Sequence, residues 1–169
     1  MLSCQLTASL LFEKNPICFL FQQVHLVVQD NIGSGAYSFI RKRTTVDKDG
    51  KKKGIIYQST EVVKKDGQVY ETKRIISARE YNTSYRSRDL TRHIVIQERI
   101  SFLYKLQSFT IHVYETPSPG LCILHAQVES SDDETPPVVD LPDFLDIDRL
   151  LEPEDESKYG SYALSVIRE

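Results

Sequence analysis

Runs of alternating apolar and polar residues recur along most of the chain, and they are rich in β-branched and aromatic side chains. A period of two is typical of strands that bury one face and expose the other. Asp-Gly pairs at 49–50 and 66–67 separate three of the runs, and this pair favours tight hairpin turns. The predicted strands are 17–30, 36–46, 54–63, 69–76, 92–104, 109–115 and 121–129.

One helix is predicted between the fourth and fifth strands. Ser77 followed by Glu80 fits a capping box, so we expect the strand to end there and a helix to run from Ala78 to about Ser87. A short helix followed by an extended piece is expected within 141–151, and one more helical turn is expected in the tail.

The short connections favour antiparallel pairing. Seven strands, or eight if 17–30 holds two, predict one mainly β (α+β) domain, either a sandwich or a barrel. The length of 169 residues is enough for a single domain with a proper core.

Charge is unevenly distributed along the chain. The formal net charge is only −3, so the totals call for no nucleic-acid partner. Between residues 41 and 105, however, basic residues outnumber acidic ones by about two to one, whereas acidic residues dominate 129–156. This asymmetry indicates an anion-binding body with a negative, solvated C-terminal tail.

The cysteines and the N-terminal region favour a cytoplasmic protein. The three cysteines have no metal-ligand spacing, and their odd number argues against a disulfide scaffold. The apolar N-terminal region is interrupted by Glu13, Lys14 and Pro16, which disfavours a signal peptide or a membrane span.

Cations at period-two positions within the strands are the candidate binding residues. Arg41 and Arg43 share one strand face, while Lys73 and Arg99 lie on two other strands. One interpretation is a solvated outer face, because Arg and Lys normally stay in water. If the sheet closes into a barrel, the same residues would line a lumen that binds phosphate oxygens through guanidinium groups.

An ordered set of segments resembles the CYTH-type, or triphosphate tunnel, domain over about residues 35–169. It is most similar to the C-terminal domain of the TRPL translocation defect protein family, in which an NTPase domain precedes the tunnel domain. The segments are FIRKR, ETKRIISAREY, IQERISFLYKLQSFTIHVYETPSPG, LPDFLDIDR and YGSYALS.

The resemblance implies a closed or nearly closed antiparallel β-barrel with one or two helices. Residues 1–30 would be a divergent segment that supplies a first strand, and 31–169 would be the barrel domain with its acidic tail. Family members are described as binding GTP and phosphoinositides and as acting in the trafficking of a photoreceptor channel. The P-loop half is missing from this sequence.

Carried over to this chain, the resemblance makes Arg41, Arg43, Lys73 and Arg99 the phosphate-binding residues. The ExExK motif that helps tunnel hydrolases bind metal is absent, Gln97 stands where the family has Lys, and His112 and His125 stand at acidic positions. Imidazole is a poor ligand for Mg²⁺ or Mn²⁺. The expected function is therefore binding without turnover, with no catalytic residue, metal or cofactor assigned.

The expected ligand is a nucleotide such as GTP, a polyphosphate or a phosphoinositide headgroup, and peripheral membrane association and membrane-protein trafficking fit the last of these. One alternative is a Mg²⁺- or Mn²⁺-dependent triphosphatase with carboxylates from Glu71, Glu115 or Glu129. A second is a degenerate barrel that binds nothing. The sequence does not fix the oligomeric state.

Three other features have a structural and a functional interpretation. His112 and His125 lie on neighbouring strands, but no third ligand has the spacing of a soft-metal site. Cys122 is expected to be a buried structural thiol. The lysine-rich hairpin at 48–53 is expected to be a solvated tip, with contact to acidic headgroups as its alternative.

Overall fold

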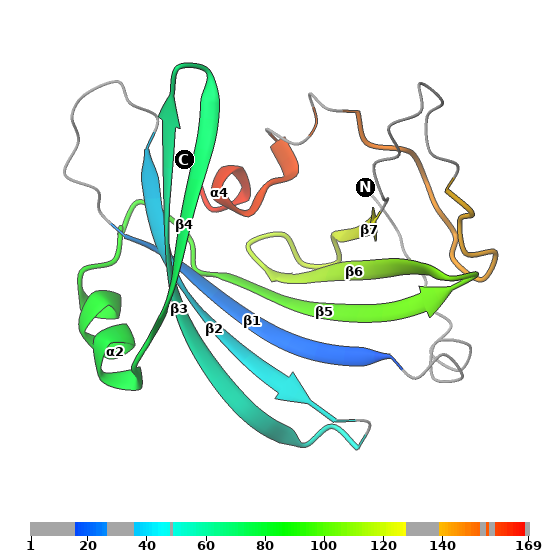
Figure 1. Ribbon diagram of the computed structural model, residues 1–169, viewed down its shortest axis with the longest axis horizontal. Helices are drawn as coiled ribbons and strands as arrows, with labels where there is room; N and C mark the ends of the chain where they lie inside the picture. Colours follow the sequence, from blue (N-terminus) through cyan, green and yellow to red (C-terminus); the bar gives the residue numbers. More distant parts are fainter. Residues whose placement is uncertain are drawn as a thin grey trace.

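The computed structural model describes residues 16–26, 36–47, 49–127, 139–152, 155 and 158–167 (Figure 1). Seven strands and two short helices account for most of these residues. The strands are β1 (Ile17–Leu26), β2 (Tyr37–Val46), β3 (Lys52–Lys65), β4 (Gln68–Ile76), β5 (Val95–Tyr104), β6 (Gln107–Thr116) and β7 (Cys122–Gln127), and the helices are α2 (Ala78–Arg86) and α4 (Ser161–Leu164).

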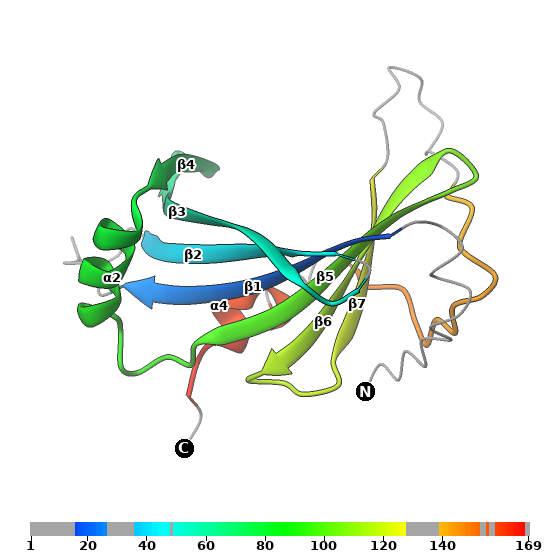
Figure 2. The same ribbon diagram turned by 90° about the horizontal axis from the view of Figure 1, so that it is seen from below.

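The strands form one antiparallel sheet in the order β4-β3-β2-β1-β5-β6-β7. The sheet is strongly curled, so its concave face forms a half-barrel (Figures 1 and 2). The predicted mainly β, antiparallel architecture with one or two helices is confirmed, in the form of a half-barrel. Over the described residues the sheet ends at β4 on one side and at β7 on the other.

Helix α2 covers the convex face at the β1–β4 end of the sheet. The predicted capping box is confirmed, because the Glu80 amide donates to Ser77 Oγ over 3.2 Å and the Ser77 amide donates to Glu80 Oε2 over 2.8 Å. Tyr81 is buried on this helix and packs with Val24 and Ile40 of the sheet. Burial of this apolar cluster fixes α2 against the outside of the half-barrel.

The C-terminal segment wraps around the edge of the sheet at β7. Leu145 packs against Phe109 and Ile111 on the convex face. Further along, Leu151 and Tyr159 pack into a second cluster on the concave face, together with strand residues of β5, β6 and β7. The segment therefore connects the two faces of the half-barrel around its β7 edge.

The short helix predicted within 141–151 is wrong. These residues form a turn in which the Leu145 amide donates to the Pro142 carbonyl over 3.2 Å, followed by irregular chain. Their apolar side chains are buried against the sheet surface that they cover, so the segment needs no helix to bury them. The expected helical turn in the tail is confirmed by α4, which lies inside the curl of the sheet (Figure 1).

Among the described residues, neither helix has the length and apolar character needed to cross a bilayer.

Candidate functional site

The strand register places Arg41, Arg43 and Arg99 on the concave face. Direct cross-strand partners point to the same side of a sheet. Arg43 pairs with Phe21 on β1. Arg99 pairs with Phe19, which lies two residues before Phe21 on β1. Arg41 lies two positions from Arg43 and so shares its face. The Arg43 guanidinium carbon lies 5.2 Å from the centroid of the Phe19 ring.

Two successive cross-strand pairs place Lys73 on the same face. It pairs with Thr60 on β3, and Thr60 pairs with Phe39, which is two residues from Arg41 on β2. Its side chain is 54% exposed, and Lys73 Nζ lies 2.7 Å from Glu71 Oε2. Lys73 therefore lies on the predicted face, but at the β4 edge and with a carboxylate partner of its own.

Arg41 and Arg99 converge from opposite sides of β1 on the ring of Phe21. The Arg99 guanidinium carbon lies 4.3 Å from the centroid of this ring, and that of Arg41 lies 5.6 Å from it. Arg41 also donates to Gln23 Oε1 from Nη2 over 2.7 Å and from Nε over 3.2 Å. An aromatic floor under two guanidinium groups is a favourable cation–π arrangement.

The two guanidinium groups are desolvated and repel each other. Burial, and then the charge of Arg41, lower the pKa of Arg99 to about 10. Burial also lowers the pKa of Arg41, against which the charge of Glu71 raises it. Within the described ranges neither arginine forms an ion pair with a carboxylate, and Arg99 Nε is buried without a hydrogen-bond partner. The centre of the concave face therefore carries a positive charge that the surrounding described groups do not neutralise.

Gln97 shares the concave face with Arg41 and Arg99 and was not predicted as a site residue. It pairs with Phe21 and with Tyr114, and its side chain is fully buried. Neither its Oε1 nor its Nε2 has a hydrogen-bond partner, although buried amides are normally paired. The signal in the sequence was its spacing, since Gln97 shares a strand face with Arg99 two residues later. Its burial without a partner depends on the packing of neighbouring strands and could not be predicted from that spacing.

The two histidines of β6 and β7 lie next to Arg99. The ring centroids of His112 and His125 are 4.2 Å apart. Burial lowers the pKa of His112 to about 2, and the charge of Arg99 adds to this effect, so His112 is neutral at neutral pH. In the described part of the chain no group of three or more His, Cys, Asp or Glu side chains is placed to hold a metal ion.

The carboxylates named for the triphosphatase alternative are not gathered at one place. Glu71 lies on the concave face and contacts Lys73. Glu115 is exposed, and the nearby Glu98, whose pKa is raised by burial and then by the charge of Glu115, faces the convex side. Glu129 lies outside the described residues.

The C-terminal segment closes one end of the concave face with an aromatic cluster. The ring of Tyr162 stacks on Tyr37, with centroids 4.0 Å apart, and meets the ring of His25 edge to face at 5.3 Å. Arg92 lies over Tyr162, with its guanidinium carbon 3.7 Å from the ring centroid. Tyr162 therefore packs the tail against the concave face.

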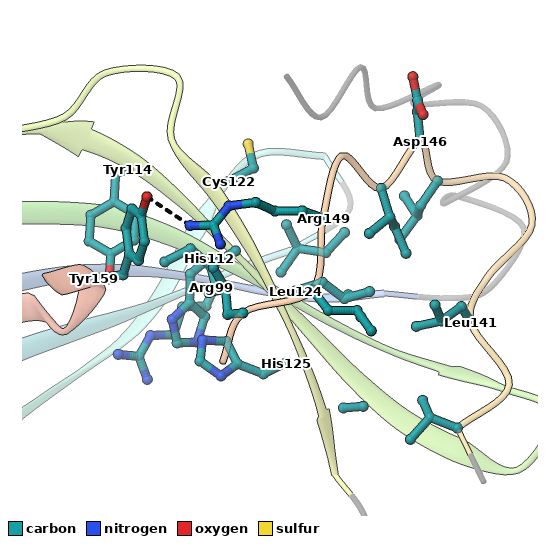
Figure 3. A pocket seen from close by; sticks show the side chains of 18 of the residues that line it. Arg99, His112, Tyr114, Cys122, Leu124, His125, Leu141, Asp146, Arg149 and Tyr159 are labelled. Atoms are coloured by element: carbon teal, nitrogen blue, oxygen red, sulfur yellow. Dashed lines mark hydrogen bonds between the residues drawn. The ribbon is translucent and has the colours of Figure 1, made fainter. Parts of the chain in front are cut away.

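A cavity of about 850 Å³ lies between β7 and the C-terminal segment (Figure 3). Arg99 and His112 lie toward one end of it and Leu141 lies at the other, with Leu124 between them. Cys122 lines the cavity and is 8% exposed, as expected for a buried thiol. The cavity therefore begins beside the arginine pair and continues into apolar surroundings.

Comparisons with models of protein families, with curated proteins and with solved structures found no match, so the resemblance to the triphosphate tunnel family stays a prediction.

Proposed function

We propose that the concave face binds a phosphorylated ligand, with Arg41 and Arg99 as the principal contacts. The observation that carries this proposal is the convergence of two desolvated guanidinium groups on Phe21 without a carboxylate partner among the described residues. A buried charge normally has a partner, because desolvation without one costs several kcal/mol. A bound anion would supply that partner.

Phosphate is the anion that this arrangement fits best. Guanidinium groups donate two parallel hydrogen bonds to phosphate oxygens, and two of them from different strands can hold one group from two sides. The amide of Gln97 adds a buried donor without a partner beneath them. Arg43 lies two residues along β2 on the same face, where it can contact a further oxygen of the ligand.

Binding without hydrolysis is the favoured form of this function. Among the carboxylates described on the concave strands, Glu71 is held in an ion pair with Lys73 rather than placed beside a second acid. A divalent ion that activates phosphoryl transfer needs several oxygen ligands. A nucleotide such as GTP, a polyphosphate and a phosphoinositide headgroup all carry the phosphate chemistry required, and the last fits a role in membrane-protein trafficking.

The first test is thermal melting of the full chain with a panel of phosphorylated ligands in the presence of EDTA. We expect tripolyphosphate, GTP or inositol phosphates to raise the melting temperature, because a ligand of the folded state stabilises it by mass action. The variant Arg41→Met/Arg99→Met should lose this shift. The matched control is Arg79→Ala/Lys64→Ala, which removes two exposed cations outside the concave centre and should keep it.

Three results would count against the proposal or replace it. Equal ligand shifts in the double Met variant and the wild type would exclude the arginine pair as the site. The absence of any shift in the wild type would favour the degenerate barrel. Release of phosphate from tripolyphosphate with Mg²⁺ or Mn²⁺, lost in Glu71→Gln, would replace binding by the triphosphatase alternative.

A further inference from the structure

The cavity beside Arg99 has a polar end and an apolar end, and this polarity bears on the class of ligand. Arg99 and His112 lie toward one end of the close-up view and Leu141 lies at the opposite end, with Leu124 between them (Figure 3). Ten of the 21 residues that line the cavity are aliphatic, and they come from β6, β7 and the C-terminal segment.

The cavity passes around the edge of β7 from one face of the sheet to the other. His125 pairs with Thr110 on the concave face, whereas Leu124 pairs with Ile111 on the convex face. The C-terminal segment from 139 to 152 forms the opposite wall. An extended ligand that entered beside Arg99 would therefore pass between β7 and this segment without crossing the sheet.

We propose that the ligand is a phosphate monoester of a hydrocarbon chain, with its phosphate at Arg99 and Arg41 and its chain in the cavity at β7. This inference rests on the proposed function and narrows its ligand class. A cavity of about 850 Å³ has room for a chain of eight or more carbons, and pockets of this size are typical of small-molecule sites. The hydrocarbon chain would cover Leu141 and Leu150, which are 43% and 70% exposed.

The charges along the cavity favour one phosphate group over several. Arg149, the second cation in its wall, is already engaged, because its Nη1 lies 2.8 Å from Asp155 Oδ2 and its Nη2 donates to the Tyr159 hydroxyl over 3.1 Å. The lining also includes Asp146 and Glu152, which would repel further phosphates along the chain path. A triphosphate extending into the cavity would meet these carboxylates, whereas a hydrocarbon chain would meet leucine and isoleucine.

A neutral His112 suits this junction between the phosphate and the hydrocarbon chain. His112 stays uncharged because burial and Arg99 lower its pKa to about 2, so it adds no second positive charge. An uncharged imidazole can donate one hydrogen bond to a phosphate oxygen and still pack against a methylene group. The polar end is therefore suited to a single phosphate followed directly by carbon.

Isothermal titration of the full chain with inorganic phosphate, butyl phosphate, octyl phosphate and octanol tests the inference. Each methylene buried should tighten binding by about fourfold, so octyl phosphate, which has four more methylenes, should bind about 250-fold more tightly than butyl phosphate. Octanol should bind far more weakly than octyl phosphate, because it lacks the anion for Arg99. Arg99→Met should remove most of the difference between octyl phosphate and octanol.

A matched pair of tryptophan variants locates the hydrocarbon chain of the ligand. Leu150 lines the cavity and is 70% exposed, so Leu150→Trp can fill the cavity without disturbing a core position. It should abolish the gain from butyl to octyl phosphate and leave the affinity for butyl phosphate within about twofold. Leu90 is 72% exposed and lies outside the cavity lining, so Leu90→Trp should keep the gain.

The outcomes separate this inference from the proposed function. If phosphate and tripolyphosphate bind in an Arg41- and Arg99-dependent way but octyl and butyl phosphate bind equally, the chain site is wrong and the anion site stands. If octanol binds as tightly as octyl phosphate, the cavity is an apolar site independent of Arg99 and the inference is overturned. If no phosphate compound binds, both proposals fail.

An experiment with vesicles tests whether the hydrocarbon chain belongs to a membrane lipid. Sedimentation with phosphatidylcholine vesicles that contain phosphatidic acid, compared with phosphatidylcholine alone, reports binding to a bilayer lipid. Co-sedimentation that Leu150→Trp abolishes would support the inference and name a membrane lipid. Octyl phosphate binding without co-sedimentation would equally support it and name a free amphiphile.

Discussion

Two arginines on the inner side of the curled sheet, Arg92 at its rim and Arg99 at its centre, differ in how completely their charge is satisfied. The guanidinium group of Arg92 donates to the Tyr162 carbonyl over 2.8 Å and to Ser165 Oγ over 3.0 Å, and its Nε lies 3.4 Å from Asp89 Oδ2. Arg99 contacts an aromatic ring but leaves Nε buried without a partner.

The difference separates a structural cation from a binding one. The hydrogen bonds of Arg92 join the loop before β5 to the C-terminal segment, and its ion pair with Asp89 fixes that loop, so its charge stabilises the folded chain. Arg99 makes no such connection, and its charge is opposed by that of Arg41. Stability should therefore depend on the rim and ligand affinity on the centre, and three substitutions test this division.

The largest effect is expected at Arg92. Arg92→Met removes an ion pair and two hydrogen bonds to the tail and leaves the Asp89 carboxylate without its cation, so the free energy of unfolding should fall by about 3 kcal/mol. Urea denaturation followed by circular dichroism measures the change. The control is Arg86→Met, on an exposed position of α2, which should change the free energy of unfolding by less than about 0.5 kcal/mol.

Retention of wild-type stability in Arg92→Met would contradict the division between rim and centre. A loss of phosphate affinity in this variant, measured under conditions in which it is fully folded, would also contradict the division, because Arg92 would then contribute to binding.

The next effect is a dependence of stability on pH at the same rim. His25 is 2% exposed, and burial together with the charge of Arg92 lowers its pKa to about 4, against which Asp89 raises it. The unfolded chain binds a proton at His25 below pH 6.5, whereas the folded chain does so only near pH 4. Stability is therefore lost as the pH falls through this window, by about 2 kcal/mol between pH 7 and pH 5.

His25→Leu should remove most of this loss. The measurement is the difference in the free energy of unfolding between pH 7 and pH 5, which is independent of any constant effect of the substitution. A slope of comparable size should remain from His112, whose pKa is lowered at least as far. His93→Gln, at an exposed histidine, is the control, and an equal reduction of the slope there would contradict the assignment to the buried ring.

The rim and the centre also differ in how far the sequence could predict them. Alternation gave the strand faces correctly, so the register places Arg41, Arg43, Lys73 and Arg99 on one side of the sheet as expected. Period-two patterns fix which residues share a face because a strand allows only two directions for its side chains. They do not fix which charges meet, and the ion pair of Lys73 with Glu71 was not foreseen.

The role of Arg92 was missed for a related reason. The sequence places it at the start of a predicted strand over 92–104, but β5 begins at Val95, and Arg92 forms an isolated bridge with Val166. Its hydrogen-bond partners in the tail are about seventy residues away in the chain, and no local pattern specifies a contact of that range. The path of 139–152 around β7 was unforeseen likewise, because it depends on the sheet edge that the segment covers.

The smallest effect, and the one of opposite sign, is expected at the centre of the concave face. Arg99→Met replaces a desolvated cation by an apolar side chain of similar length and removes its repulsion with Arg41, so the free energy of unfolding without ligand should rise by about 1 kcal/mol. Urea denaturation in a buffer free of phosphate and sulfate measures this rise, and adding tripolyphosphate should stabilise the wild type more than the variant. The gain is expected because Arg99 has no carboxylate partner in the described chain, whereas the same substitution at Arg92 would break existing bonds. A loss of stability at Arg99 comparable to that at Arg92 would show that both arginines are structural, and the concave centre would then have no charge in reserve for a ligand.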